Sequence, residues 1–380
     1  MKWDKDFASF DGRIWLNAAS EGPLPLAAAC ALEKAVAWKS RPFLMDHSKF
    51  VRVVADLKES IGRLIGVLPN DVILGNSASY GLHLLANGIL WREGDEILLM
   101  QNDFPANILP WLALEDKGVK VIQIPARENV LRPEQFIENI SGRTRLFCIS
   151  HVHTFTGYVL EIEGFSRICR EKGISLVLNI SQSVGTTPVD VSRIGVDAVV
   201  AAGYKWLCGP YGTGFCWIRP QLRDRLILNQ AYWIAVLSAE DLKKEGPLTR
   251  RDIKTARKFD VFGTANFFNF VPFRAAIDYW LKIGLDEVRV YHDHLIDILV
   301  DGLKDSPYDF VSPRQGRDRS SLVVISHRDR NKNEKIHQEL LSRGVYTALW
   351  KGNIRIAPHV YNTDKEIAQL IKLLNRLGRH

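Results

Sequence analysis

Short apolar runs alternate with amphipathic segments between about residue 70 and residue 220. The runs have the length of buried strands, and many end at small or polar residues. Between most of them lie segments with helical periodicity, for example 79–90 and 165–173. Strands that alternate with helices indicate a mostly parallel sheet covered by helices on both faces. The predicted strands are 71–75, 96–100, 119–124, 145–150, 174–180, 196–202 and 213–218.

The elements outside this block predict a second, smaller domain. A helix is expected over 23–40, where prolines precede a periodic segment. Long helices near 266–282 and 285–304 lead to apolar runs and to a last helix from about residue 363. We therefore expect a large domain over 20–265 and a small α+β domain from 1–19 and 266–380. The strands expected in the small domain are 321–327, 345–350 and 353–358.

The composition is that of a soluble globular protein, with 46% hydrophobic and 24% charged residues in a chain of 380. No apolar run reaches the ~18 residues of a membrane helix, and the opening MKWDKDFASFDGR does not resemble a signal peptide. We therefore expect a cytoplasmic protein with no membrane partner. The net charge of +7 is spread along the chain without a nucleic-acid-binding signature, so no nucleic-acid partner is expected either.

The five cysteines are scattered along the chain and contain no closely spaced pair. Their spacing predicts neither a zinc site nor a disulfide framework, and no other metal site is expected. Small buried apolar side chains are the simplest interpretation of these cysteines. They are Cys30, Cys148, Cys169, Cys208 and Cys216.

Ligands of an open parallel sheet bind beyond the carboxyl ends of its strands, so the residues at these ends are the candidates for chemistry. Ser77 and Ser79 follow the first strand, at the start of a predicted helix. They would form an anion site with free backbone N–H groups, or serve only as a helix cap. Phe104, the segment 151–154, and Asn179 with Gln182 follow later strands.

Lys205 follows the predicted strand 196–202 and is surrounded by small and aromatic residues in AAGYKWLCGPYGTG. A desolvated amine with a lowered pKa is what imine chemistry with an aldehyde cofactor requires. A surface lysine that packs its stem on apolar neighbours is the alternative. An anion site, an aromatic ring, an amide and a lysine at successive strand ends together fit one ligand, a phosphorylated heteroaromatic aldehyde.

Several segments resemble the class V aminotransferase family of pyridoxal-phosphate (PLP) enzymes, in order and in spacing. They are LNAASEGPLP, DFPANILPW, SHVHTFTG, NISQSVGTTPVD, GYKW and APHVYNT. The likeness is greatest to the isopenicillin N epimerase-like and C–S lyase branch, which is related to cysteine desulfurases. The resemblance implies PLP as cofactor, an amino acid as substrate and a homodimer with shared active sites. It also implies fold type I, with a large seven-stranded domain and a smaller one.

The resemblance also assigns roles to single residues. Lys205 would form the Schiff base with the cofactor and then carry the proton at Cα. Arg355, in GNIRIAPH, would bind the α-carboxylate, with Ala18 and Ala19 on the substrate side. Thr264 would reach the phosphate from the neighbouring subunit. The full set of expected cofactor-binding residues is Ser77, Ala78, Ser79, Phe104, Thr154, Asn179, Gln182, Ala202, Tyr204 and Thr264.

The chain departs from the family pattern at several of these positions. Asn179 stands where relatives have an aspartate under the pyridine nitrogen, and a neutral amide favours protonation of that nitrogen less. Thr154 stands where an asparagine is frequent, while Ala202 and Tyr204 replace a serine and a histidine. No cysteine follows Cys216, although desulfurases carry a nucleophilic cysteine in their C-terminal third. Formation of a persulfide on the protein is therefore disfavoured.

These features predict an enzyme that forms a Cα carbanion, with β-elimination of the C–S lyase type as the leading reaction. A class V aminotransferase is the alternative, and a decarboxylating or oxidative deaminase is another. A protein that keeps the fold only as a binding module is the non-enzymatic alternative. The segment 230–257, with Tyr232 and Trp233, is expected to help form the substrate pocket.

Overall fold

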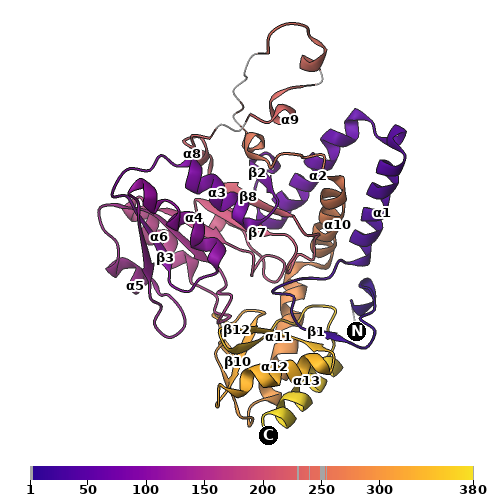
Figure 1. Cartoon of the computed structure of the whole chain (residues 1–380), viewed down its shortest axis with the longest axis vertical. Helices are drawn as coiled ribbons and strands as arrows, with labels where there is room; N and C mark the ends of the chain where they lie inside the picture. Colours follow the sequence, from indigo (N-terminus) through magenta and orange to yellow (C-terminus); the bar gives the residue numbers. More distant parts are fainter. Residues whose placement is uncertain (1–2, 229–230, 239, 249–252, 254, 380) are drawn as a thin grey trace.

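The structure is a computed structural model that describes residues 3–379, apart from 229–230, 239, 249–252 and 254. A large sheet and its helices fill the upper part of Figure 1, and the C-terminal elements form a smaller unit below it. The N-terminal segment runs beside this smaller unit, although it is far from it in sequence.

The large sheet has seven strands in the order β2-β8-β7-β6-β5-β3-β4. All neighbouring pairs are parallel except those of β8, which is antiparallel to both β7 and β2. The mostly parallel sheet predicted from the sequence is confirmed, and each strand lies within its predicted run or differs from it by one residue. The strands are β2 Val72–Gly75, β3 Glu96–Met100, β4 Lys120–Ile124, β5 Thr144–Ser150, β6 Ser175–Asn179, β7 Ala198–Ala202 and β8 Gly214–Ile218.

Both faces of this sheet are buried under helices, as alternate residues of one strand show. Leu98 packs into the apolar cluster that includes α2 (His47–Ile65), α6 (Ile162–Lys172) and α10 (Phe267–Ile283). Its neighbours Ile97 and Leu99 pack into the opposite cluster, with α3 (Ala78–Gly88) and α4 (Leu109–Leu112). Successive side chains of a strand point to opposite faces, which is why the central strands read as continuous apolar runs.

The helices predicted on either side of the sheet block are present. They are α1 (Leu26–Ser40), α10, α11 (Leu285–Gly302) and α13 (Asp364–Leu377). A capping box of Thr363 and Glu366 begins α13, as its sequence favours. The shorter helices are α5 Pro133–Glu138, α7 Val191–Ile194, α8 Pro220–Arg223 and α9 Trp233–Val236.

The sequence reasoning missed α2 and α12 (Lys332–Ser342). The signals of α2 were present at both of its ends. The Asp46 side chain accepts a hydrogen bond from the Lys49 N–H, and Gly66 ends the helix with a φ of 72°. An N-cap acid and a left-handed C-terminal glycine are both standard helix boundaries.

The smaller unit is built on a four-stranded antiparallel sheet, in the order β12-β13-β10-β9. Apolar residues of α11, α12 and α13 pack against this sheet. The run 345–350, predicted as one strand, is divided, because its first part pairs with β1 and its second part with β13. The strands are β1 Ile14–Trp15, β9 Tyr308–Phe310, β10 Val323–His327, β11 Val345–Tyr346, β12 Ala348–Trp350 and β13 Asn353–Ile356.

The parallel pairing of β1 with β11 joins the N-terminal segment to the C-terminal part of the chain. On this ground we propose that 1–19 and 266–380 form the small domain and 20–265 the large one. At the proposed boundary, α10 packs against α1 and α2, with the Phe267 ring in contact with the rings of Trp38 and Phe50.

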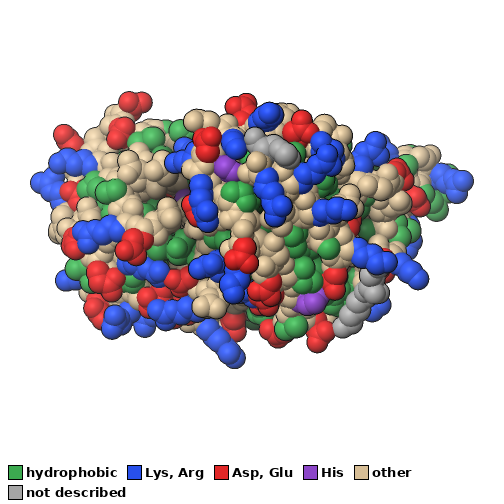
Figure 2. Space-filling model, turned by 90° about the horizontal axis from the view of Figure 1, so that it is seen from below, with side chains coloured by type: hydrophobic (Ala, Val, Ile, Leu, Met, Phe, Trp, Pro, Cys, Tyr) green, Lys and Arg blue, Asp and Glu red, His purple; other side chains and the backbone are tan. Residues whose placement is uncertain are grey.

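On the face shown in Figure 2, acidic and basic side chains are interspersed over the surface, without one large basic field. Within the described ranges, no helix is long and apolar enough to span a bilayer.

Candidate active site

Lys205 lies in the loop that follows β7, and hydrogen bonds hold this loop on every side. Within the loop, the Cys208 N–H donates to the Lys205 carbonyl at 2.9 Å, and the Gly209 N–H donates to the Gly203 carbonyl at 2.8 Å. From outside, the Gly22 N–H donates to the Tyr204 carbonyl at 2.9 Å. The backbone on both sides of the lysine is thus fixed.

Two further donors reach this loop from the C-terminal part of the chain. His359 Nε2 lies 2.9 Å from the Trp206 carbonyl, and Trp280 Nε1 donates to the Leu207 carbonyl at 2.8 Å. His359 is fully buried and stacks on the Trp280 ring at 4.7 Å. Consecutive carbonyls of the loop therefore have partners from several elements, which limits the freedom of the lysine backbone.

Gly22 approaches the lysine too closely for any other residue. A Cβ at this position would lie 2.1 Å from the Lys205 carbonyl oxygen and 2.5 Å from Cys208 Sγ. This contact explains the glycine in the LNAASEGPLP segment and brings that segment against the lysine loop.

The Lys205 side chain is buried, with 8% of its surface exposed. Its Nζ lies 5.0 Å from the centroid of the Phe104 ring. Burial, with the positive charge of Arg355 as a second cause, lowers the pKa of Lys205 to about 8. A neutral amine is therefore readily available near neutral pH, as predicted for imine chemistry.

Arg355 on β13 is buried without a carboxylate partner in the described part of the chain. It is 2% exposed, and its Nη2 donates to Ser20 Oγ at 2.5 Å and to Asn17 Oδ1 at 3.3 Å. Its Nε has no hydrogen-bond partner among the described residues, and burial lowers the pKa of the guanidinium to about 10. A buried guanidinium with a free N–H suits an anionic ligand.

Asn179, at the end of β6, is the first member of a buried chain of polar side chains. Its Nδ2 donates to Asn107 Oδ1 at 2.8 Å, and its Oδ1 accepts from the Ser181 N–H at 3.0 Å. Asn107 Nδ2 then donates to Asp103 at 2.9 Å and to Ser150 Oγ at 2.8 Å. The amide at position 179 is therefore oriented by its neighbours.

Gln182 joins the N-terminal segment to the lysine loop. Its Nε2 donates to the Ala19 carbonyl at 3.0 Å, and its Oε1 accepts from Trp206 Nε1 at 2.8 Å. Ala18 and Ala19 are buried here, and the Ala18 N–H donates to the Ala357 carbonyl at 3.2 Å. The segment around these alanines thus lies between the large sheet and the strand that carries the arginine.

Ser77 is the N-cap of α3, where its Oγ accepts from the Tyr80 N–H at 3.3 Å. The N–H groups of Ala78 and Ser79, in the first turn, have no carbonyl partner within the helix and are available to an anion. A Cβ at Gly214 would lie 2.8 Å from Ser77 Cα, so a glycine is needed there for close packing. Ser77 is thus able to cap α3 while the N–H groups of Ala78 and Ser79 bind an anion.

Ala202 ends β7, and Tyr204 directly precedes the lysine in the loop that follows. The Ala202 N–H donates to Ser181 Oγ at 3.0 Å. The Tyr204 ring lies 5.8 Å from the ring of Tyr211, and burial raises the pKa of Tyr204. The phenol therefore stays protonated and is able to donate a hydrogen bond.

Thr154 and Thr264 are buried but lie outside these hydrogen-bond networks. Thr154 is buried just after β5, and Thr264 is buried in the turn before α10. Within the described residues, neither side chain makes a hydrogen bond to the protein. Of the segment 230–257, residues 230, 239, 249–252 and 254 lie outside the described residues, while Tyr232 packs on Phe262 at 5.4 Å.

The sequence reasoning did not single out several residues that orient the site. Asn17 and Ser20 hold Arg355, and Asn107 holds Asn179. All three lie in segments that carried the family resemblance, LNAASEGPLP and DFPANILPW. Their roles depend on contacts between distant parts of the chain, and such contacts leave no local signal in the sequence.

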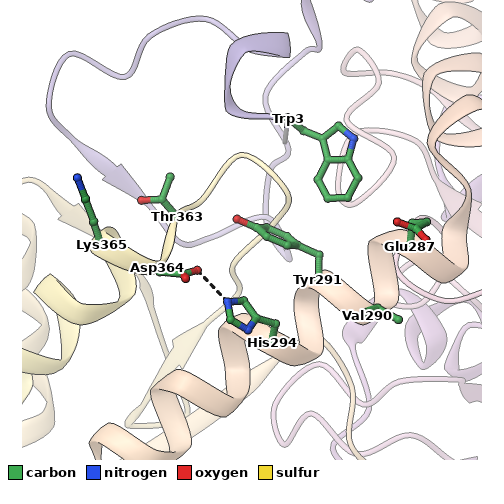
Figure 3. A pocket seen from close by; sticks show the side chains of 8 residues that line it. All are labelled: Trp3, Glu287, Val290, Tyr291, His294, Thr363, Asp364 and Lys365. Atoms are coloured by element: carbon green, nitrogen blue, oxygen red, sulfur yellow. Dashed lines mark hydrogen bonds and ion pairs between the residues drawn. The ribbon is translucent and has the colours of Figure 1, made fainter. Parts of the chain in front are cut away.

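A cavity of about 660 Å³ lies away from these residues, between the N-terminal segment, α11 and the start of α13. Figure 3 shows Trp3, Tyr291 and the hydrogen bond between His294 and Asp364, at 3.0 Å, around it. None of the predicted site residues lines it. No group of three or more possible metal-ligating His, Cys, Asp or Glu side chains lies in the described part of the chain.

The residues around Lys205 fit PLP. The buried amine suits its aldehyde, the free N–H groups of α3 suit its phosphate, and Phe104 offers a ring beside the lysine. With the seven-stranded, mostly parallel sheet, they define a PLP-dependent enzyme of fold type I. The family model for aminotransferase class-V matches residues 32–370, and the chain belongs to this family.

Similar proteins bear the names of aminotransferases and of cysteine desulfurases. An uncharacterized aminotransferase, YcbU, of Bacillus subtilis is 30% identical over 342 residues, which cover 90% of this chain and 85% of the relative. A probable cysteine desulfurase of Methanothermobacter thermautotrophicus is 26% identical, with 98% and 97% of the two chains covered.

The solved structures that are similar include two of the protein C-DES. In one of them, glycine is covalently linked to the PLP cofactor; its TM-score is 0.88 at 21% identity, with 98% of each chain covered. The other shows the cystine C–S lyase C-DES with its product cysteine persulfide; its TM-score is 0.86 at 21% identity, with 97% and 98% covered. At this identity the likeness concerns the fold.

Proposed function

We propose that the protein catalyses β-elimination on an amino acid, with cleavage of a C–S bond as the leading reaction. The observation that carries this proposal is the pair of buried cations, Lys205 and Arg355, neither of which is paired with a carboxylate among the described residues. When bound, PLP supplies an aldehyde that condenses with the substrate amine and a ring that withdraws electrons from Cα.

In this proposal the two cations have separate roles. Arg355 binds the α-carboxylate through its free Nε and the adjacent Nη, while Asn17 and Ser20 hold the other side of the guanidinium. Neutral Lys205 then removes the proton from Cα, and the electron pair of that C–H bond allows the sulfur at Cβ to leave. The low pKa of Lys205 supports its role as a base.

The cysteines support a lyase that does not form a persulfide on the protein. Cys208, near the lysine, is fully buried, and burial raises the pKa of its thiol well above the ordinary value. Burial likewise raises the pKa of Cys216 and of Cys148. Cys30 is exposed, but it lies on α1. The solved structure of the cystine C–S lyase C-DES with its product cysteine persulfide supports C–S cleavage as a reaction of this fold.

Asn179 favours elimination over transamination. A neutral amide supplies no charge that would stabilise a protonated pyridine ring, and transamination needs a long-lived carbanion. Transamination is nevertheless the second candidate, because the family and the relative YcbU bear that name.

We also propose that the remaining predicted residues bind the cofactor in a homodimer. Ser77, Ala78 and Ser79 would hold the phosphate, with help from Tyr204 in place of a histidine. An apolar surface lies beside Tyr204, where Tyr211 is 65% and Phe268 is 44% exposed, and a partner subunit would cover it. Thr264 would then reach the phosphate of that partner, and Gln182 and Thr154 would lie near the phenolic oxygen of the cofactor.

Activity is tested with purified, PLP-loaded protein and S-substituted cysteines. Elimination releases pyruvate and ammonia without any keto acid, whereas transamination converts the cofactor to its amine form and needs a keto acid to continue. The exposed control variant Lys335→Ala should retain both the cofactor absorbance and the activity. Lys205→Ala should lose the borohydride-sensitive absorbance and at least about a thousandfold in rate. A protein that takes up no PLP would overturn the proposal.

The shared-site dimer is tested by mixing two inactive variants. Lys205→Ala and Thr264→Ala subunits, when mixed in equal amounts and allowed to exchange, should regain up to about one quarter of the activity if Thr264 serves the partner's site. Random pairing makes about half of the dimers mixed, and each mixed dimer has one intact site out of two. No recovery, or a monomer by light scattering, would contradict the shared site.

A further inference from the structure

A cavity of about 300 Å³ opens where the C-terminal edge of the large sheet meets the small sheet. We call it the distal cavity. It is distinct from the cavity of Figure 3, which lies beside α11 and α13. Residues that line the distal cavity include Asn102, His153, Phe155, Arg330, Lys351 and Asn353.

The distal cavity adjoins the reaction site through a row of aromatic rings. Lys205 Nζ lies over the ring of Phe104, whose centroid is 6.4 Å from that of Phe155. The Phe155 ring lies 5.9 Å from the Trp350 ring, and the Arg355 guanidinium lies 5.7 Å from Trp350. A substrate held between the lysine and the arginine would thus extend along Phe155 into the cavity.

The charge in the distal cavity is positive. Arg330 and Lys351 line it, and none of the described residues that line it is an aspartate or glutamate. Within the described part of the chain, no carboxylate lies within ion-pair distance of either cation. Lys351 Nζ lies 5.5 Å from the Phe155 ring centroid, and Arg330 Nη2 donates to the Lys351 carbonyl at 3.4 Å. Two adjacent cations without counter-charges favour an anion.

The other polar groups of the cavity suit the same kind of ligand. Asn102, Asn129 and Asn353 bring side-chain amides that are able to donate hydrogen bonds. Lys351 has a left-handed backbone, with a φ of 52°, in the turn between β12 and β13, and the next residue, Gly352, has a φ of 76°. The turn joins β12 to β13, the strand that carries Arg355. One hairpin therefore supplies both Arg355, near Lys205, and Lys351, in the distal cavity.

We propose that the distal cavity binds the side chain of the substrate, and that Arg330 and Lys351 select amino acids whose side chain ends in an anion such as a carboxylate. This inference rests on the proposed function, since it assumes an amino acid between Lys205 and Arg355. It adds the class of the substrate: a β-substituted alanine, such as an S-conjugate of cysteine, with an acidic group several bonds from Cβ.

The test compares near-isosteric ligands that differ in charge. PLP-loaded protein is titrated with S-(2-carboxyethyl)cysteine and with its neutral amide, S-(2-carbamoylethyl)cysteine, and binding is followed by the absorbance of the cofactor. The acid should bind about tenfold more tightly than the amide at low salt, and the preference should shrink as salt is raised.

Variants then assign the preference to the two cations. Arg330→Gln and Lys351→Gln should each weaken binding of the acid roughly threefold, and the double variant about tenfold, while the amide binds as before. The matched control removes two exposed charges elsewhere, Lys335→Gln with Arg376→Gln on α12 and α13, and should leave both ligands unaffected.

The outcomes separate this inference from the proposed function. If both ligands change the absorbance of the cofactor with equal affinity, or if the double variant keeps the preference, the distal cavity does not select an anion although the enzyme still binds amino acids. If no amino acid changes the absorbance of the loaded protein, the proposed function fails, and the inference fails with it.

Discussion

The side-chain nitrogen of Asn179 donates a hydrogen bond of 2.8 Å to the side-chain oxygen of Asn107. Since that oxygen accepts, the nitrogen of Asn107 donates in the opposite direction, to Asp103 at 2.9 Å. Asp103 also accepts from the N–H and the hydroxyl of Ser150, at 2.9 and 2.7 Å. The donors all point from position 179 toward the buried side chain of Asp103, and this direction fixes how the amides of Asn179 and Asn107 are turned.

Replacement of Asn179 by aspartate should therefore disturb this chain. A carboxylate would face the oxygen of Asn107, and two acceptors would lie opposite each other unless Asn107 turned its amide away from Asp103. We expect Asn179→Asp to lower the free energy of unfolding of the cofactor-free protein by about 1–3 kcal/mol. Urea unfolding measures this change, and an unchanged midpoint would contradict it.

The cofactor-loaded Asn179→Asp variant should also show a changed absorbance spectrum and more transamination, because the added charge favours ring protonation. The matched double variant Asn179→Asp with Asp103→Asn moves the carboxylate instead of adding one. It should regain at least about half of the lost stability, since Asn107 is then able to turn and satisfy both neighbours.

Lys205 should make the stability of the cofactor-free protein depend on pH in the alkaline range. Its folded pKa of about 8 lies below the ordinary 10.5, so between these values the unfolded chain binds the proton and the folded chain does not. Stability should thus rise between pH 8 and pH 10.5, by up to about 3 kcal/mol for this group. The measurement is the unfolding free energy of wild type minus that of Lys205→Met, which should rise between pH 8 and pH 10.5. A difference that stays constant over this range would contradict the linkage.

The rate of PLP uptake by the cofactor-free protein should follow the same group. Uptake needs the neutral amine, so the rate should rise with pH and level off above about 8. Arg355 contributes to the low pKa, and Arg355→Gln should shift the midpoint of this profile upward. A midpoint that stays in place would show that the two cations do not interact.

Arg355 should contribute to substrate binding at the expense of stability. Because its guanidinium is buried without a carboxylate partner in the described residues, Arg355→Met should unfold at an equal or higher urea concentration in the absence of substrate. The same variant should raise KM about a hundredfold, and Arg355→Lys should restore only part of the loss, since an ammonium cannot bind bidentately. A lower midpoint for Arg355→Met would indicate a structural role.

His359 should make the protein sensitive to acid. Burial lowers its pKa to about 4, below the ordinary 6.5, so stability is lost as the pH falls from about 6.5 toward 4. This group alone accounts for up to about 3 kcal/mol. His359→Gln should be less stable than wild type at pH 7, because the bond to Trp206 is weakened, and the gap should narrow at pH 5. A gap that is constant with pH would contradict this assignment.

The local pattern of apolar residues was sufficient to predict most strands of the large sheet, because strands buried on both faces must be apolar throughout. It was less informative in the small unit, where 345–350 divides between two sheets and Thr347 lies between the parts. The choice of pairing partner depends on β1, more than 300 residues away in sequence, and such pairing leaves no local signal.

The sequence by itself determined the class of fold, the strand ends at which chemistry is expected, and Lys205 with Arg355 as its leading candidates. Only the tertiary structure decided how these residues are held. It brought Asn17 and Ser20 to Arg355, aligned Asn107 with Asn179, and placed Arg330 and Lys351 beside Phe155. The physical reason is that periodicity records which side chains are buried, whereas hydrogen-bond direction and unpaired charge depend on groups from distant segments that meet only in the folded chain.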